Sequence, residues 1–558
     1  MAISGSSGFI PKFFLCLRNY SKRTFISDLI AGVTVGLVAL PLAMAFAISS
    51  GVAPQYGLYT AIIAGFLVSL LGGSRVQIAG PTGAFVVVVY GVIAKYGVDG
   101  LYMCTLMAGI MLVLLGVTGL GMAVKYIPRP VVIGFTNGIA VLIASTEIKD
   151  FFGLKVDIVP GAFIPRIATL GQHWHTFSAP ATIIAVSVVV VIVAMRKFFP
   201  RIPGSIVALL AATIAATALH LPVETIQSRF GGIPGGLPHI AIPHLRPDLI
   251  LTLLSPAVTV AMLGAVESLL SAVVADRMSG DRHNPNVELM AQGVANLISP
   301  LVGGLPATGA IARTATNIRS GGKTPVAGMI HALTLLGIIA VFAPQAKNIP
   351  LCVLAGILMV VCYNMGEWSE IPEILKQSKA DIAVWLITFS LTVLADLSFA
   401  VEVGMILAAL LYIYKVTTTT TVSKVTQQYV DAGIPHSLQM NPIPEGAAVY
   451  RIHGPFLFGA ADKLSVIEEA MDTLPPVVIV RLRNMTAIDA TGLHAMENLA
   501  DALKKSGRQL LVCGMRDQPA RIMAQAEFHE HIGEANILPS LADATRRARE
   551  ILAGGARG

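Results

Sequence analysis

The sequence has few charged residues for its length. Of 558 residues, only 13% are Asp, Glu, Lys or Arg, about half the roughly 25% of an average soluble protein. Apolar residues make up 54% of the chain, and the mean hydropathy is +0.73. Because so few charges cannot keep so apolar a chain in water, these values exclude an ordinary soluble protein and predict a membrane protein.

Cysteine and enzyme motifs are also scarce. The five cysteines show no paired spacing, which excludes a disulfide framework and a metal cluster. The chain has no phosphate loop, no HExxH and no GxSxG, so we expect no enzyme, no cofactor and no metal site. The net charge of +7 does not indicate a nucleic-acid partner, because membrane proteins concentrate Lys and Arg on cytoplasmic loops.

Long apolar stretches follow one another from Leu29 to Tyr414. Most are near the roughly 20 residues that cross a bilayer, and we count about fourteen. Four basic residues precede the first stretch: Lys12, Arg18, Lys22 and Arg23. Alternate loops on that same side carry most of the remaining Lys and Arg, which predicts an even number of spans with both termini in the cytoplasm. We expect a multi-pass protein of the plasma (inner) membrane.

Two apolar segments are too short to cross. Gly80 and Pro81 interrupt one run and leave about 12 residues after the proline, and a second short run follows Pro306 and carries Arg313. Both are predicted half-helices. Each begins with Thr-Gly-Ala, starting at Thr82 and again, 226 positions later, at Thr308. A Val-Thr-Val triplet recurs at nearly the same offset, which predicts a duplication of seven spans as a 7+7 inverted repeat.

The chain changes character after Lys415. A run of five threonines, 417–421, leads to a polar stretch and then to alternating strands and helices. We expect strands at 448–452, 477–482 and 510–513 with helices at 461–474 and 492–503, a small cytoplasmic α/β domain. The predicted division is an amino-terminal segment 1–27, a transmembrane transport domain 28–416, a linker 417–440 and the α/β domain 441–558.

The two half-helices are the candidate functional site. A helix amino terminus carries about half a positive charge and unpaired N–H groups, so two of them facing each other at mid-membrane form an anion site. Thr82 and Thr308 would supply hydroxyls and helix caps there. The alternative is a kinked span in which each threonine bonds its own backbone.

Two charged residues lie within the apolar spans. Arg313 is a forked, permanently charged donor that suits an oxyanion, unless it extends to the membrane surface instead. Glu267 is the only carboxylate between Ile250 and Val274. It could hold and release a proton or pair with a cation, which makes it the candidate coupling residue, or it could be a fixed partner of Arg313. Glu147 lies near Lys149 and Asp150, and we interpret these three as an interfacial helix-end cluster.

These strings resemble the sulfate permease (SulP) anion transporter family. The resemblance rests on the run from Asp28 to Pro41, on the run from Gly51 to Tyr59, and on Gly80, Pro81 and Thr82. The tail resembles that family's STAS domain through Gly454, Pro455, Phe458 and the run Ile488 to Gly492. Within the family, the strings from Ser50 to Tyr59 and from Phe135 to Gly138 look most like the bacterial branch that includes a C4-dicarboxylate transporter.

The resemblance implies an elevator-like transporter, usually a homodimer, with a core and a gate. The family's anion site lies between spans three and ten and is lined by spans one and eight. Carried over by position, substrate binding falls on Pro41, Ala45, Thr82, Gly83, Ala84, Phe85, Thr308, Gly309, Ala310 and Arg313, and coupling falls on Glu267. Close members carry Gln at the position of Glu147. The tail has Ala490 where switching STAS domains carry an acceptor serine, which leaves Asp489 and Thr491 as regulatory candidates.

The predicted function is a secondary transporter of small anions such as sulfate, bicarbonate or a C4-dicarboxylate, coupled to H+ or to Na+. Its expected partners are the anion, membrane lipid, a second copy of the chain and a cytoplasmic protein bound through the STAS domain. One alternative is a nucleobase permease of the same fold, although neutral substrates do not call for Arg313. Another is a membrane sensor that binds an anion and signals through the tail.

Overall fold

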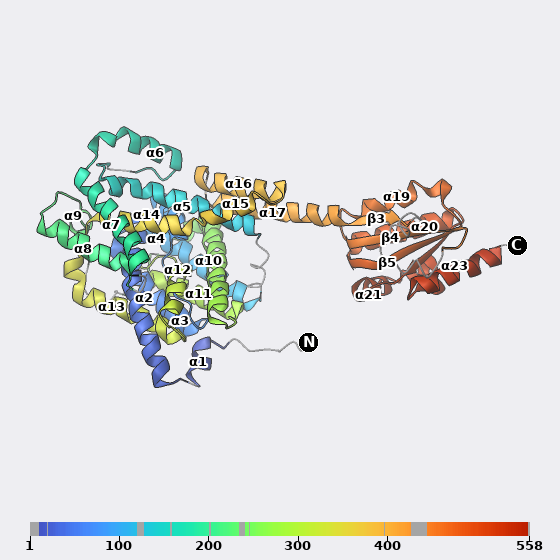
Figure 1. The fold of residues 1–558 in the computed structure, drawn as a ribbon, viewed down its shortest axis with the longest axis horizontal. Coiled ribbons are helices and arrows are strands. Elements are labelled where there is room, and N and C mark those ends of the chain that lie inside the picture. The colour runs from blue at the N-terminus through green and yellow to red at the C-terminus, as the bar shows by residue number, and fades with distance from the viewer. Residues whose placement is uncertain are drawn as a thin grey trace. The chain divides into compact units, whose positions relative to one another are not determined.

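The computed structural model describes residues 10–18, 20–119, 128–156, 159–199, 202–233, 240–244, 246–395, 397–425 and 443–555. The chain divides into two compact units, residues 1–408 and 409–558. The first unit is helical and the second contains a sheet (Figure 1).

Helices of the first half of the helical unit follow one another closely. They are α1 (Lys12–Leu17), α2 (Lys22–Ser49), α3 (Pro54–Leu71), α4 (Gly83–Val117), α5 (Arg129–Phe152), α6 (Phe163–Gln172), α7 (Ala179–Phe198), α8 (Gly204–Ala218) and α9 (Ile226–Phe230), with the short strand β1 (Ala79–Gly80) before α4. Pro54 stands at the first turn of α3, where its missing N–H costs no hydrogen bond. Gly97 has a left-handed backbone (φ 70°) that divides α4 into two helical segments.

The second half repeats this order with a second short strand. It contains α10 (Ile250–Ser279), α11 (Pro285–Ile298), β2 (Thr308–Gly309), α12 (Ile311–Arg319), α13 (Pro325–Ala346), α14 (Leu351–Met365), α15 (Ile371–Ile374), α16 (Lys379–Leu394) and α17 (Leu397–Thr419). In the described part of the chain, eight helices are long and apolar enough to cross a membrane. With α4 divided in two, the shorter helices α8, α11, α12 and α16, and the 23-residue α17, the segments agree with the predicted number of about fourteen.

The helices of the first unit pack in two groups. In the first group, α2 packs against α3 and α13, α4 packs against α10 and α11, and α10 packs against α12. In the second group, α5 packs against α14 and α16, and α7 packs against α8 and α14. Fewer contacts join the groups, chiefly from α2 to α8 and α14 and from α4 to α5. We call them the first and second helix groups.

The second unit is the predicted α/β domain. Its five-stranded sheet has the order β3-β4-β5-β6-β7, with β3 antiparallel to β4 and the other neighbours parallel. The elements are β3 (Thr421–Lys424), β4 (Ala447–Phe456), β5 (Val477–Ile488), α20 (Ala490–Lys505), β6 (Gln509–Cys513), α21 (Asp517–Gln525), α22 (His529–Ile532), β7 (Ile537–Leu538) and α23 (Leu541–Gly555). Consecutive residues of β5 pack alternately into the two apolar cores on opposite faces of the sheet. Because both faces are covered, this strand begins with a continuous apolar run.

The secondary structure of two segments in this region differs from what the sequence suggested. The predicted linker 417–440 is ordered at its start, because residues 417–419 finish α17 and the β-branched run that follows forms β3, paired to β4. Lys463 also donates to the Thr417 carbonyl at 2.6 Å. The predicted helix 461–474 is instead three short turns, at Ala461–Leu464, Ser465–Glu468 and Met471–Thr473. The rest of the linker, 426–440, lies outside the described residues.

Candidate functional site

The site is built on two strands of two residues each. β1 and β2 pair antiparallel, with Ala79 opposite Gly309 and Gly80 opposite Thr308. The pair continues where the Ala310 N–H donates to the Ile78 carbonyl at 2.8 Å. Since α4 and α12 begin directly after these antiparallel strands, the two helices start at opposite ends of the strand pair. The inverted repeat of the whole unit stays a prediction.

Side chains of α10 hold β2 in place. The Ser268 hydroxyl lies 2.7 Å from the Thr308 hydroxyl and accepts from the Gly309 N–H at 3.1 Å. The Thr308 hydroxyl also donates to the Gly264 carbonyl at 3.1 Å. Gln77, just before β1, donates to the Ser268 carbonyl at 3.1 Å, so the same turn of α10 binds both strands.

Polar side chains of α12 satisfy the irregular backbone before β1. Thr314 accepts from the Ile78 N–H at 3.0 Å, and Asn317 donates to the Val76 carbonyl at 2.8 Å. Unpaired backbone groups inside a membrane are costly, so irregular chain is tolerated only where other groups bond it. These contacts explain how a non-helical segment can lie in the middle of the unit.

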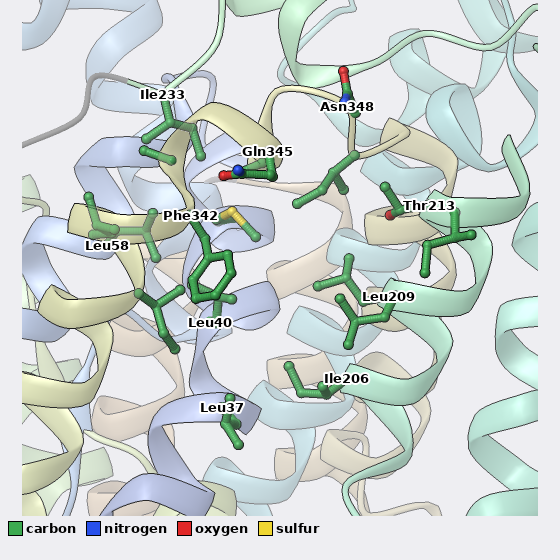
Figure 2. A pocket seen from close by; sticks show the side chains of 18 of the residues that line it. Leu37, Leu40, Leu58, Ile206, Leu209, Thr213, Ile233, Phe342, Gln345 and Asn348 are labelled. Atoms are coloured by element: carbon green, nitrogen blue, oxygen red, sulfur yellow. The ribbon is translucent and has the colours of Figure 1, made fainter. Parts of the chain in front are cut away.

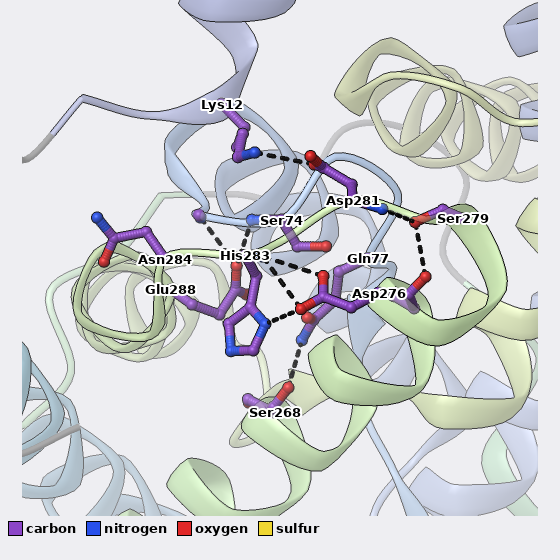
Figure 3. Close-up of polar contacts among 12 residues, drawn as sticks. Lys12, Ser74, Gln77, Ser268, Asp276, Ser279, Asp281, His283, Asn284 and Glu288 are labelled. Atoms are coloured by element: carbon purple, nitrogen blue, oxygen red, sulfur yellow. Dashed lines mark hydrogen bonds and ion pairs between the residues drawn. The ribbon is translucent and has the colours of Figure 1, made fainter. Parts of the chain in front are cut away.

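The segment that leads from α3 to β1 also bonds residues near the end of α10 and in α11. Glu288 accepts from the backbone N–H groups of Gly73 and Ser74 at 2.9 and 3.1 Å. Nearby, His283 bonds Asp276 at 2.7 Å (Figure 3). A salt bridge of 2.9 Å joins Lys12 of α1 to Asp281 in the α10–α11 turn (Figure 3). The connection from α3 to β1 is therefore fixed to the α10–α11 pair.

Glu267 bonds the first residue of the α4 half-helix. The Thr82 hydroxyl donates to Glu267 Oε2 at 2.9 Å. Thr82 occupies the N-cap position of α4 but makes no side-chain cap bond, and the N-cap of α12 is Ala310 rather than Thr308. The prediction that the two threonines cap the half-helices is therefore wrong, because both hydroxyls bond groups of α10 instead.

Arg313 is buried, with 2% of its surface exposed. Its Nη2 donates to the Pro81 carbonyl at 2.8 Å, while its Nη1 is buried without a hydrogen-bond partner. Burial excludes extension to the membrane surface. Among the described ion pairs, none joins Arg313 to Glu267, so the alternative of a fixed partnership between them is also not observed.

The remaining predicted binding residues surround this point. Gly83 faces the second helix group, since a Cβ built on it would lie 2.9 Å from Ile143 of α5 and 3.3 Å from Met365 of α14. Phe85 is buried and its ring lies beside Gly264 of α10. The other predicted residues, Pro41, Ala45, Ala84 and Ala310, are buried in or next to α2, α4 and α12. The site thus lies where the two helix groups meet.

The prediction for Glu147 is wrong. Glu147 is 6% exposed and accepts from the Ser49 hydroxyl at 2.5 Å, so it is a buried contact between α5 and the end of α2. Its neighbour Asp150 instead forms the predicted kind of helix-end contact, an ion pair with Arg229 at 2.7 Å. The two carboxylates are three positions apart and so are neighbours on the surface of α5, but Glu147 bonds Ser49 of α2 whereas Asp150 bonds Arg229.

The regulatory candidates lie in the second unit. Asp489 is the N-cap of α20, where its carboxylate accepts from the Gly492 N–H at 2.9 Å and from the Phe458 N–H at 2.8 Å. Thr491 is exposed in the first turn of the same helix. Asp489 therefore holds the loop after β4 against α20, and Thr491 is accessible.

Several site residues were missed in the sequence. They are Gln77, Ser268, Thr314, Asn317 and His331. His331 of α13 is fully buried, and neither ring nitrogen has a hydrogen-bond partner. Polar residues in otherwise apolar segments were the available signal. Within the described ranges, no group of three or more His, Cys, Asp or Glu could hold a metal ion.

Known proteins resemble the chain along nearly its whole length. The Sulfate permease family matches residues 25–388, and the STAS domain matches residues 440–544. YvdB of Bacillus subtilis (strain 168) is 40% identical over 93% of this chain and 96% of its own. The bicarbonate transporter BicA of Synechocystis sp. is 31% identical over 94% of both chains.

Solved structures also resemble the chain. The transmembrane domain of a cyanobacterial bicarbonate transporter BicA superposes with a TM-score of 0.62 at 32% identity, covering 70% of this chain and 98% of its own. The murine anion transporter Slc26a9 in its inward-facing state superposes with a TM-score of 0.85 over 99% of this chain and 96% of its own; at 18% identity it shares the fold. On these matches, the chain belongs to the sulfate permease family, and its second unit carries that family's STAS domain.

Proposed function

We propose that the chain is a secondary transporter of a small anion, which binds where α4 and α12 begin. The observation that carries this proposal is the β1–β2 pair. It brings two helix amino termini together beside Arg313, whose Nη1 is buried and unpartnered. Helix amino termini and a guanidinium attract the same ligand, an oxyanion. A buried donor without a partner in the protein favours binding of an oxyanion from solution.

The cation that drives uptake acts at Glu267. The Thr82 hydroxyl donates to this carboxylate, and Thr82 is the N-cap residue of α4. The cation site and the anion site therefore share Thr82. An ionised Glu267 repels an anion at the same point, whereas a protonated one does not, so proton binding and anion binding favour each other. A sodium ion on the carboxylate would act in the same direction.

The transport movement takes place between the two helix groups. The site lies at their junction, and Gly83 of the first group faces Ile143 and Met365 of the second. A shift of the first group along the second would carry the anion across in an elevator-like manner, with two chains forming a homodimer. The protein lies in the inner membrane with both chain ends in the cytoplasm. From there the STAS domain regulates the movement.

The names of the relatives support the proposed substrate class. BicA carries bicarbonate and Slc26a9 carries anions, and the family takes its name from sulfate. The test is uptake of labelled sulfate, bicarbonate, succinate and fumarate into proteoliposomes containing the purified full chain. Saturable accumulation of one anion supports transport. Saturable binding without flux would overturn it and favour the membrane sensor.

A further inference from the structure

A separate cavity lies between the two helix groups. It has a volume of about 650 Å³ and is lined by α8, α13, α2, one residue of α3, Ile233 after α9, and Asn348 and Ile349 after α13 (Figure 2). This volume is within the roughly 300–1,000 Å³ of small-ligand sites. The lining is almost entirely aliphatic and includes no charged side chain, so the cavity cannot serve the anion.

The cavity is elongated along the helices. On α8 its lining recurs at helical spacing over three turns, with Ile206, Leu209, Thr213 and Thr217. From Ile206 to Thr217 an α-helix rises about 17 Å, at about 1.5 Å per residue. Half of the roughly 30 Å hydrocarbon layer is about 15 Å. The groove therefore has the depth of a single membrane leaflet.

Polar groups gather at one end. Gln345 and Asn348 lie toward one end of the cavity, and Leu37 and Ile206 toward the other (Figure 2). The wall between them contains a buried Thr213 hydroxyl oxygen without a hydrogen-bond partner. An elongated apolar groove with a polar end matches an amphiphile lying parallel to the helices.

The polar end belongs to one leaflet. Asp28, near the start of α2, accepts from the N–H of Thr324 at 3.2 Å and from its hydroxyl at 2.6 Å. Because Thr324 is the N-cap of α13, α2 and α13 start together and run in the same direction. Gln345, near the end of α13, therefore lies on the membrane side away from the start of α2.

We propose that this groove holds one acyl chain of a phospholipid from the leaflet on that side. The glycerol ester region lies at Gln345 and Asn348, whose amides donate to ester oxygens, and the chain end lies near Leu37 and Ile206. The occupant separates α8 of the second helix group from α2 and α13 of the first. Binding does not depend on the proposed transport activity.

The experiment is photolabelling of the full-length protein in liposomes. The probe is phosphatidylcholine with a diazirine near the end of one acyl chain, and labelled peptides are identified by mass spectrometry. We expect labelling to concentrate on α8 and on Leu37–Met44 of α2. The reference is Ile183 of α7, an apolar side chain that is 68% exposed.

Two variants narrow the groove. Thr213→Phe and Thr217→Phe should each reduce labelling of α2 by about tenfold, as expected when about two methylene contacts are lost. The matched control, Ile183→Phe, adds the same ring on α7 and should change nothing at the groove. Thr217→Phe serves as the second variant because Thr217 is exposed and tolerates a larger side chain more readily.

Either of two results would overturn the proposal. Equal labelling of α7 and α8 means bulk lipid only, and labelling of α7 without labelling of α8 or α2 means that the groove does not admit an acyl chain. Labelling is measured without any anion present. A protein that fails to transport but labels at the groove therefore contradicts the proposed function and leaves the lipid site in place.

Discussion

At the scale of single residues, the two terminal nitrogens of Arg313 have different surroundings. Nη2 bonds the Pro81 carbonyl and fixes the start of α4, while Nη1 has no partner. Arg313→Ala should weaken anion binding by about tenfold to a hundredfold, because a hydrogen bond to a charged group contributes about 1.5–3 kcal/mol. Binding of labelled anion to purified protein measures this change.

The Lys variant separates charge from geometry. Arg313→Lys retains the charge but not the fork, so it should recover only part of the affinity. Thermal unfolding of each variant reports how much the lost bond to Pro81 destabilises the fold. If a well-folded Arg313→Ala protein bound the anion with unchanged affinity, Arg313 would have no part in the site.

The second residue prediction concerns Glu267. In Glu267→Gln the side-chain carbonyl can still accept from Thr82, but the site is permanently neutral. The variant should bind and exchange anions and lose the stimulation of uptake by a proton gradient. Uptake is measured at several external pH values. Wild-type uptake should rise as pH falls, and the variant should respond little.

The matched control is Glu147→Gln. Glu147 is buried and, like Glu267, accepts from a hydroxyl, that of Ser49, yet it lies on α5 against the end of α2 and outside the β1–β2 site. Its substitution should leave the pH response intact. If Glu267→Gln still accumulated the anion fully in response to a proton gradient, Glu267 would not be the coupling residue.

Charged residues of the site could be identified from the sequence, but its small polar residues could not. Arg313 and Glu267 are conspicuous because a charged side chain in an apolar membrane segment is energetically costly and usually functional. Ser268 is not, since a hydroxyl in a membrane helix usually bonds the carbonyl four residues earlier. Ser69 and Thr105 do so here. Only the fold distinguishes Ser268 from these.

At the scale of elements, the strand pair depends on glycine at one crossing. A Cβ on Gly309 would lie 1.8 Å from Gln77 Nε2 and 3.2 Å from the Ser268 backbone. Gly309→Ala should therefore displace the Gln77 amide and break its bond to the Ser268 carbonyl, lower the unfolding free energy by about 1–3 kcal/mol, and weaken anion binding. Gly337→Ala on α13 is the control, because nothing lies within 4 Å of its Cβ position.

The half-helices were predictable and the strands were not. Proline and glycine interrupt the apolar runs at Gly80–Pro81 and Pro306, and interruption is a local signal. A strand of two residues has no periodicity to detect, and its partner is more than two hundred positions away. The helix expected at 461–474 forms only as three short helical pieces, because the fold can override an amphipathic pattern.

At the scale of the whole molecule, every described contact of the anion site lies in the unit 1–408. A chain truncated after Thr420 should therefore keep its anion affinity, although its transport rate can change because domains influence movement between states. Equilibrium binding and initial uptake rates, measured on the same preparation, separate the two effects. Lost affinity in a folded, truncated protein would show that the STAS domain helps to form the site.

The pairing of β1 with β2 has a consequence for biogenesis. Ala79 and Gly80 leave the ribosome long before Thr308 and Gly309, so the first broken segment enters the bilayer with its backbone groups unmatched. Neither half of the protein can finish this crossing alone. The newly made first half must wait, shielded by the insertion machinery or by its own helices, until the chain has been synthesised beyond residue 309.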